Sequence, residues 1–137
     1  MSNSIVRSAL EARLQLWAQA QTPVPAIAFE NRAFTKPAMS STTPLWVECK
    51  LLPNQPFSRD TTALKETFIG FFQVNVWGPT NNGMGQTEQL ANSIKQAFPV
   101  IPKIGGVSIE QPPKVGSPLQ DSGWIVVPVL ISYRYES

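Results

Sequence analysis

The residues that most often carry chemistry are scarce in this sequence. It contains no histidine and a single cysteine, Cys49. The commonest general base and the commonest metal ligand are therefore absent. One cysteine can form neither an internal disulfide nor a thiolate cluster for zinc or an iron–sulfur centre. We therefore expect no catalytic residue, no metal site and no cofactor, and we expect Cys49 to pack as a small core residue.

The remaining candidates for chemistry form no recognisable signature. Glu48 and Glu66 could pair as acid and base, but single carboxylates are also what half-exposed strand ends carry. The glycine-containing run at residues 82–86 precedes a helix, as a phosphate-binding loop does. It lacks the Lys and Ser/Thr of a P-loop, and the third glycine and distal acid of a dinucleotide site. We interpret it as a turn followed by a helix start.

Composition favours a protein that associates with other proteins. Hydrophobic residues make up 42% of the 137 residues and charged residues 15%, against about 25% charged in a typical soluble domain. A weakly charged surface costs little to desolvate. The net charge of +2 comes without any run of Lys or Arg, which argues against sequence-specific binding of nucleic acid. No stretch is apolar enough for a signal peptide or a membrane span, so we expect a cytoplasmic protein.

Hydrophobic periodicity predicts two helices and several strands. Val6, Leu10, Leu14 and Trp17 recur at helical spacing, and prolines after residue 22 end that helix. Alternation with a period of two predicts strands, each with a buried face. Gly78 and Pro79 are expected to end the strand at residues 65–77. The expected helices cover residues 3–20 and a segment ending at residue 98, and the expected strands cover 26–30, 45–52, 65–77, 107–109 and 123–135.

This element order predicts one α+β domain over residues 1–137, with a mainly antiparallel (mixed) sheet and two helices packed on it. Pro128 falls inside the last strand, and its missing amide requires an edge or a position without a ladder bond. An edge near that long apolar strand would invite pairing with another subunit. The four tryptophans lie in helix or strand segments, where core or interface packing is their more common use.

The segment at residues 53–64 is the candidate contact region. It is polar and longer than most connections between strands. It could be an arm that reaches a neighbouring subunit, with an apolar anchor and polar contacts, or simply a solvated loop. The candidate interface residues are Phe57, Ser58, Arg59, Asp60, Thr61 and Thr62.

Four stretches, taken in order, are similar to a known family. They are residues 70–79 (GFFQVNVWGP), 94–99 (IKQAFP), 111–113 (QPP) and 123–133 (GWIVVPVLISY). Together with the opening helix and residues 29–31 (FEN), they resemble the tail terminator and minor tail proteins of long-tailed bacteriophages. The order and spacing of the stretches carry the resemblance, which spans nearly the whole chain.

The resemblance implies a tail-terminator-like fold and a structural, non-enzymatic role in the virion tail, with assembly in the cytoplasm of the bacterial host. It implies a homo-oligomeric ring, a hexamer, that binds the last ring of tail-tube protein and stops its polymerisation. The ring would present a surface to the head–tail connector or neck proteins, and DNA would pass through its lumen without tight binding.

Three alternatives stay open at the level of sequence. The chain could be another ring component of the neck or the tail tube. It could be a small-ligand-binding α+β domain, with polar groups around Gln73 and Asn75. An enzyme would need carboxylates or lysines with shifted pKa values clustered in a cleft.

Overall fold

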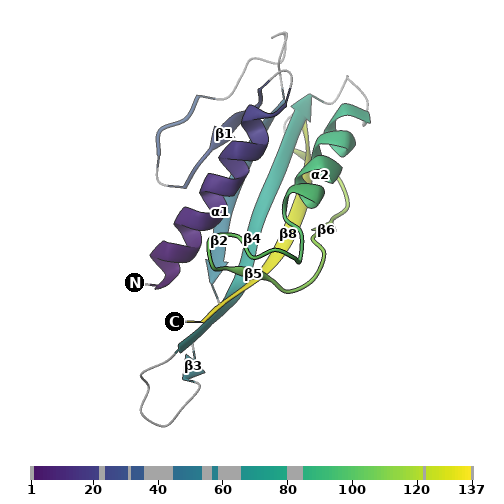
Figure 1. Cartoon of the computed structure of the whole chain (residues 1–137). Coiled ribbons are helices and arrows are strands. Elements are labelled where there is room, and N and C mark those ends of the chain that lie inside the picture. Colours follow the sequence, from purple (N-terminus) through teal and green to yellow (C-terminus); the bar gives the residue numbers. More distant parts are fainter. Residues whose placement is uncertain are drawn as a thin grey trace.

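The computed structural model has two helices lying on one face of a β-sheet (Figure 1). The structure describes residues 2–21, 24–30, 32–35, 45–53, 57–58, 66–79, 85–121 and 123–136. The helices are α1 (Ser2–Gln19) and α2 (Gly85–Ala97). The strands are β1 (Ala26–Ala28), β2 (Trp46–Pro53), β3 (Phe57–Ser58), β4 (Glu66–Pro79), β5 (Ser108–Ile109), β6 (Lys114–Val115), β7 (Leu119–Asp121) and β8 (Trp124–Glu136).

Two long antiparallel strands, β4 and β8, form the centre of the sheet. They pair continuously from Thr67 opposite Glu136 to Pro79 opposite Trp124. The order of the described strands is β1-β2-β4-β8-β5, with β3 joined to β4, and β6 and β7 joined to β8. The pairing of β1 with β2 is parallel, and the other pairings are antiparallel. The expected α+β fold, a mainly antiparallel mixed sheet with two helices on it, is confirmed.

The core lies between the helices and one face of the sheet. Alternate residues of the long strands face α1 and α2, as a period of two requires. On α1, all four residues that the spacing placed on the buried face are buried. Val6, Leu10 and Leu14 are fully buried, and Trp17 is 6% exposed. The main contributions from the strands are Val47, Cys49, Leu51, Phe72, Val74, Val76, Val127, Val129 and Ile131. The helices are also joined directly, because Trp17 Nε1 on α1 donates to Ser93 Oγ on α2 at 2.8 Å.

The strand β4 is longer at its end than the sequence predicted. Gly78 pairs with Ile125 and Pro79 with Trp124, so both residues belong to the strand. A Cβ added to Gly78 would lie 2.7 Å from Thr87 Oγ1, which shows that glycine is needed for close packing rather than for a turn. Pro79 is tolerated because it is the last residue of the strand, where a missing amide costs little.

Pro128 lies in an interior strand, at a position without a ladder bond toward β4. Its carbonyl oxygen accepts from the Gly116 amide at 2.7 Å, on the β6 side. A strand residue directs its amide and carbonyl to the same side, so the missing amide also faces β6. The prediction of a non-bonded position is therefore confirmed. The expectation of a free edge beside this strand is wrong, because β5, β6 and β7 pair along the outer side of β8.

Three short strands lie in segments that the sequence predicted to be loops. They are β3, within the polar segment at residues 53–64, and β6 and β7, in and after the proline-rich crossing at residues 112–118. Each has two or three residues and pairs with β4 or β8. The expected strand around residues 107–109 is shifted, since Val107 instead forms an isolated bridge with Ile104.

Candidate interaction surfaces

In the part of the chain that the structure describes, the residues that could take part in a reaction or bind a metal are either buried or far apart from one another. The side chain of Cys49 is 1% exposed, and burial raises its pKa to about 12. Because the thiolate is the reactive form, this thiol is inert at neutral pH. Within the described ranges, no three His, Cys, Asp or Glu side chains come together as a metal-binding group. There too, no helix is long and apolar enough to cross a membrane.

The face of the sheet away from the helices, the outer face, carries a row of hydrogen-bonded polar side chains. Gln73 Nε2 donates to Asn75 Oδ1 at 2.8 Å, and Asn75 Nδ2 donates to Glu48 Oε1 at 3.0 Å. Trp77 Nε1 donates to the same carboxylate oxygen at 3.3 Å. The amides that the ligand-binding alternative relied on are thus bonded to each other and to Glu48. They stabilise the outer face across β2 and β4.

An aromatic cluster covers one end of the outer face. The rings of Trp46 and Trp77 stack with centroids 5.0 Å apart, and Trp124 meets Trp46 edge-on at 6.0 Å. Phe34, from the segment after β1, packs against Trp46 at 5.2 Å. Trp46 and Trp124 are 7% and 3% exposed. Trp46 and Trp124 therefore pack as a small second core with the half-buried Trp77.

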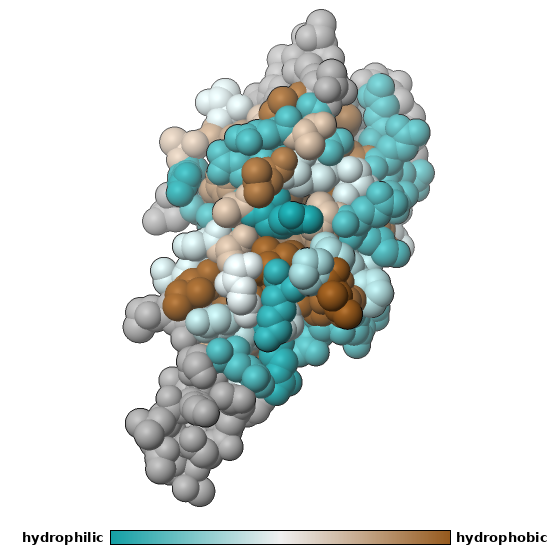
Figure 2. Space-filling model, viewed as in Figure 1, coloured by the Kyte–Doolittle hydropathy of each residue, from teal (hydrophilic) through white to brown (hydrophobic). Residues whose placement is uncertain are grey.

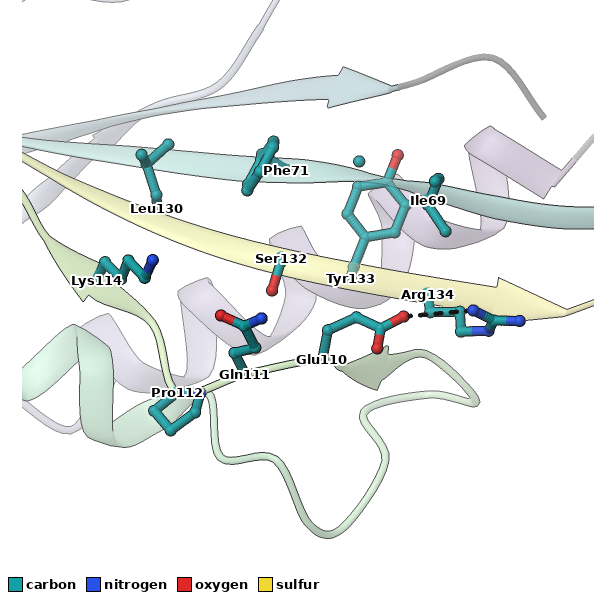
Figure 3. Close-up of a pocket in the computed structure, with 11 residues that line it drawn as sticks. Ile69, Phe71, Glu110, Gln111, Pro112, Lys114, Leu130, Ser132, Tyr133 and Arg134 are labelled. Carbon is teal, nitrogen blue, oxygen red and sulfur yellow. Dashed lines mark ion pairs between the residues drawn. The ribbon is translucent and has the colours of Figure 1, made fainter.

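The other end of the outer face holds a groove of about 540 Å³. Its floor contains Ile69 and Phe71 from β4 and Leu130 from β8, and Figure 3 shows Phe71 and Leu130 close together on neighbouring strands. The wall is the segment that carries Glu110, which forms a 3.8 Å ion pair with Arg134. Phe71 and Leu130 are 42% and 36% exposed. This end of the sheet therefore presents an apolar floor with a charged rim.

The free edge of β2 is closed by a side chain. Beyond the three residues paired with β1, the Leu51 amide donates to Glu30 Oε1 at 2.7 Å. The same carboxylate forms a short ion pair with Arg7 of α1. Burial acts to raise the pKa of Glu30, but the hydrogen bonds from Leu51 and Arg7 outweigh it, and the pKa lies below its ordinary value. A carboxylate on an edge amide, with Pro53 just after it, blocks the addition of another strand there.

The candidate interface residues lie at one end of the molecule. Figure 1 shows β4 and β8 running beyond the helices, with β3 beside β4 at that end. Phe57 pairs with Thr67 and Ser58 with Glu66, so the backbone of both residues belongs to the sheet. Arg59, Asp60, Thr61 and Thr62 lie outside the described residues. The structure places two of the six candidates on a projecting strand and leaves their role as a contact a prediction.

Comparison with known proteins identifies the family. The model of the phage tail terminator protein family matches residues 5–133. The chain belongs to this family. A solved structure that carries no functional description is also similar, with a TM-score of 0.78 and 33% sequence identity over 98% of this chain and 95% of the other. No curated protein matches. The resemblance seen in the sequence is therefore confirmed.

Membership of the tail terminator family makes this chain a structural component of the phage tail. In such a protein the relevant sites are contact surfaces. Of the features described above, the outer-face groove and the projecting end at β3 are candidates, and the closed edge of β2 is a place where pairing with another strand is blocked. Sequence reasoning found part of the projecting end and missed the groove and the closed edge. Both missed features combine residues far apart in the chain, such as Arg7, Glu30 and Leu51.

Proposed function

We propose that this protein caps the tail tube as a homo-oligomeric ring, which stops tube polymerisation and provides the surface that joins the tail to the head–tail connector or neck. The observation that carries the proposal is the match to the tail terminator family over nearly the whole chain. The expected ring is a hexamer. It assembles in the host cytoplasm, with tail-tube protein on one side and connector or neck protein on the other.

Features of the folded chain support a structural role. The outer face exposes Phe71 and Leu130 at a groove, and exposed apolar surface of this kind is typical of protein contacts. A ring needs contacts between unlike surfaces of neighbouring copies. The two faces of this fold are unlike, since helices cover one and strands form the other.

The test is tube assembly with and without the protein. Tail-tube protein is polymerised with rising amounts of this chain, and tube lengths and ends are measured by electron microscopy. We expect shorter tubes, each with a distinct cap at one end, and a ring mass in light scattering, either alone or after tube ends are added. A chain that polymerises into tubes by itself would instead be a tube subunit. A chain that leaves tube length unchanged and does not bind tube ends would refute the proposal.

A further inference from the structure

The exposed face of α1 carries no charge. Seven of its described side chains are exposed, and they are Ser4, Ile5, Ser8, Ala12, Gln15, Leu16 and Gln19. Two of these are large and apolar, since Ile5 is 44% exposed and Leu16 62% exposed. Figure 2 shows hydrophobic surface over α1 in the same view as Figure 1. A solvated helix face normally carries charged side chains.

The charged residues of α1 are held by other parts of the same chain. Arg7 pairs with Glu30 and lies 3.7 Å from Glu11. Arg13 Nε donates to the Ala97 carbonyl at 2.7 Å. All three charged side chains lie on the half-buried flanks of the helix. The outward face of α1 can therefore be covered without removing a charge from water.

The second helix shows the ordinary pattern. The exposed positions of α2 include Glu88 and Lys95. Covering that face would bury charged groups, and a buried charge without a partner is costly. The neutral face is thus a property of α1 and does not follow from the low charge of the chain as a whole.

The outer-face groove has the chemistry and dimensions of a surface that takes a neutral helix. Its apolar floor is extended by Leu52, which lies directly opposite Phe71 and is 43% exposed. The floor runs about 13 Å along the strands from Ile69 to Leu130, which lies opposite residue 73 of β4, and three strands make it about 10 Å wide. Ile5 and Leu16 lie about 16 Å apart along α1, and a helix is about 10 Å in diameter.

We propose that the exposed face of α1 of one copy lies in the outer-face groove of a second copy. The proposal rests on the proposed ring function and names the surfaces that join its subunits. The charges near the groove, Glu110, Lys114 and Arg134, stand at its rim, so they would flank the neutral helix and stay in contact with water. Each copy carries both this groove and this helix face, so the contact is heterologous and can propagate around a ring.

The helix that binds in the groove belongs to a second copy, because this chain carries both complementary surfaces, the neutral face of α1 and the apolar groove. A helix with charges on its outward face would bury them against Phe71 and Leu130, whereas α1 brings only neutral side chains. The α1 helix of the same copy cannot fill the groove, because it packs on the opposite face of the sheet (Figure 1). The aromatic cluster fills the other end of the outer face in each copy, which leaves the groove end as the place for a neighbour.

The first test introduces a charged side chain on each of the two contacting surfaces in turn, the α1 face and the groove. Leu16→Glu and Phe71→Glu should each weaken self-association, measured by light scattering alone and on tube ends, by about tenfold or more, because each buries a carboxylate among apolar side chains. Ile101→Glu is the matched control, since Ile101 is 82% exposed and lies between α2 and β5, outside both α1 and the groove lining. It should assemble like the wild type. Mixing Leu16→Glu with Phe71→Lys should restore association, and normal assembly of both single variants would overturn the proposal.

The second test identifies the contacting surfaces. Cys49 is buried and inert, so a cysteine introduced on the surface reacts alone. Leu16→Cys and Phe71→Cys are mixed and treated with a short bifunctional maleimide. We expect a mixed cross-linked dimer, and little cross-linking of either variant with itself. Cross-linking of Leu16→Cys mainly with itself would show a helix–helix contact and overturn the proposal.

The outcomes also separate this proposal from the proposed function. Rings or capped tubes that form without the mixed cross-link would leave the capping function intact and refute the contact between α1 and the groove. A mixed cross-link in a chain that never shortens or caps tubes would support the contact and refute the capping function. Absence of both assembly and cross-link at high protein concentration would refute both.

Discussion

Removing the Glu30 carboxylate should open the edge of β2 and loosen α1 at the same time. The carboxylate accepts the Leu51 amide at 2.7 Å and pairs with Arg7 of α1. Glu30→Ala removes both interactions, whereas Glu30→Gln keeps a carbonyl oxygen that can still accept from Leu51. The two variants therefore separate the contribution of the edge cap from that of the ion pair.

The expected loss follows from the burial of each contact. A hydrogen bond to a charged group contributes about 1.5–3 kcal/mol. The Leu51 amide lies at a sheet edge, where water can replace the lost acceptor, so the low end of that range applies. The ion pair is more than a third exposed on both sides, and pairs of this kind contribute about 0.2–1 kcal/mol. We expect a loss of about 2 kcal/mol for Glu30→Ala and about 1 kcal/mol for Glu30→Gln.

Urea unfolding at neutral pH measures the two losses, and hydrogen exchange reports on the Leu51 amide itself. Exchange at Leu51 should accelerate in Glu30→Ala and much less in Glu30→Gln. Glu110→Ala is the control, because its carboxylate makes only a 3.8 Å surface pair with Arg134. It should change stability little. Unchanged stability together with an equally protected Leu51 amide in Glu30→Ala would refute the edge-cap reasoning.

The same carboxylate predicts a pH dependence. The pKa of Glu30 is lowered in the folded chain, because the hydrogen bonds from Leu51 and Arg7 outweigh the effect of burial. Its contribution is fully present above the ordinary glutamate pKa of about 4.3 and is lost as the pH falls through the lower folded value. The stability difference between wild type and Glu30→Gln should therefore shrink on acidification below about pH 4.3. A difference that grows in acid would contradict this sign.

Three further predictions concern residues under the sheet surface. Tyr133→Phe should raise the free energy of unfolding in urea by about 1 kcal/mol. The buried Tyr133 hydroxyl has no hydrogen-bond partner among the described residues, and its loss of hydration on folding is therefore uncompensated. A decrease would mean that the hydroxyl is satisfied in solution. Gly70→Ala should lower the free energy of unfolding by about 3 kcal/mol, because overpacking against backbone is not easily relieved. Its Cβ would lie 2.5 Å from the Leu52 carbonyl oxygen, and an equally stable variant would show that β2 moves aside. Cys49 should react with a thiol reagent only as fast as the chain opens, since it is buried with a raised pKa, and rapid labelling of the native protein would contradict its burial.

The long elements could be predicted because each has its own periodic signal. Val6, Leu10 and Leu14 define one face of α1, and the helix observed at Ser2–Gln19 differs by one residue at each end from the expected 3–20. In β4, alternation identified the strand, but its end was misjudged at Gly78. Glycine normally indicates a turn. Here it makes room for Thr87 from α2, a contact across residues that local sequence does not reveal.

The short strands and the surfaces could not be predicted in this way. A pair of residues such as Phe57–Ser58 has no period of its own, and it forms a strand because β4 offers free backbone groups beside it. The groove needs Phe71, Leu130 and the segment around Glu110 to be brought together. The edge cap needs Arg7, Glu30 and Leu51. In each case the feature depends on which strands are neighbours, and neighbour identity is a property of the whole fold.

The neutral face of α1 is different, because its pattern is already present in the sequence. Once Val6, Leu10 and Leu14 are assigned to the buried face, the helical repeat places Ile5 and Leu16 on the outward face. The outward side chains between these two residues are only small ones or amides. The structure adds that the charged residues beside this stripe are bound within the chain. An exposed leucine contributes little to the stability of a monomer. The position of Leu16 on a helix face without charged side chains therefore favours a contact with another molecule. The low total charge of the chain favours association, and the positions of its charges are the basis for proposing α1 as an associating surface.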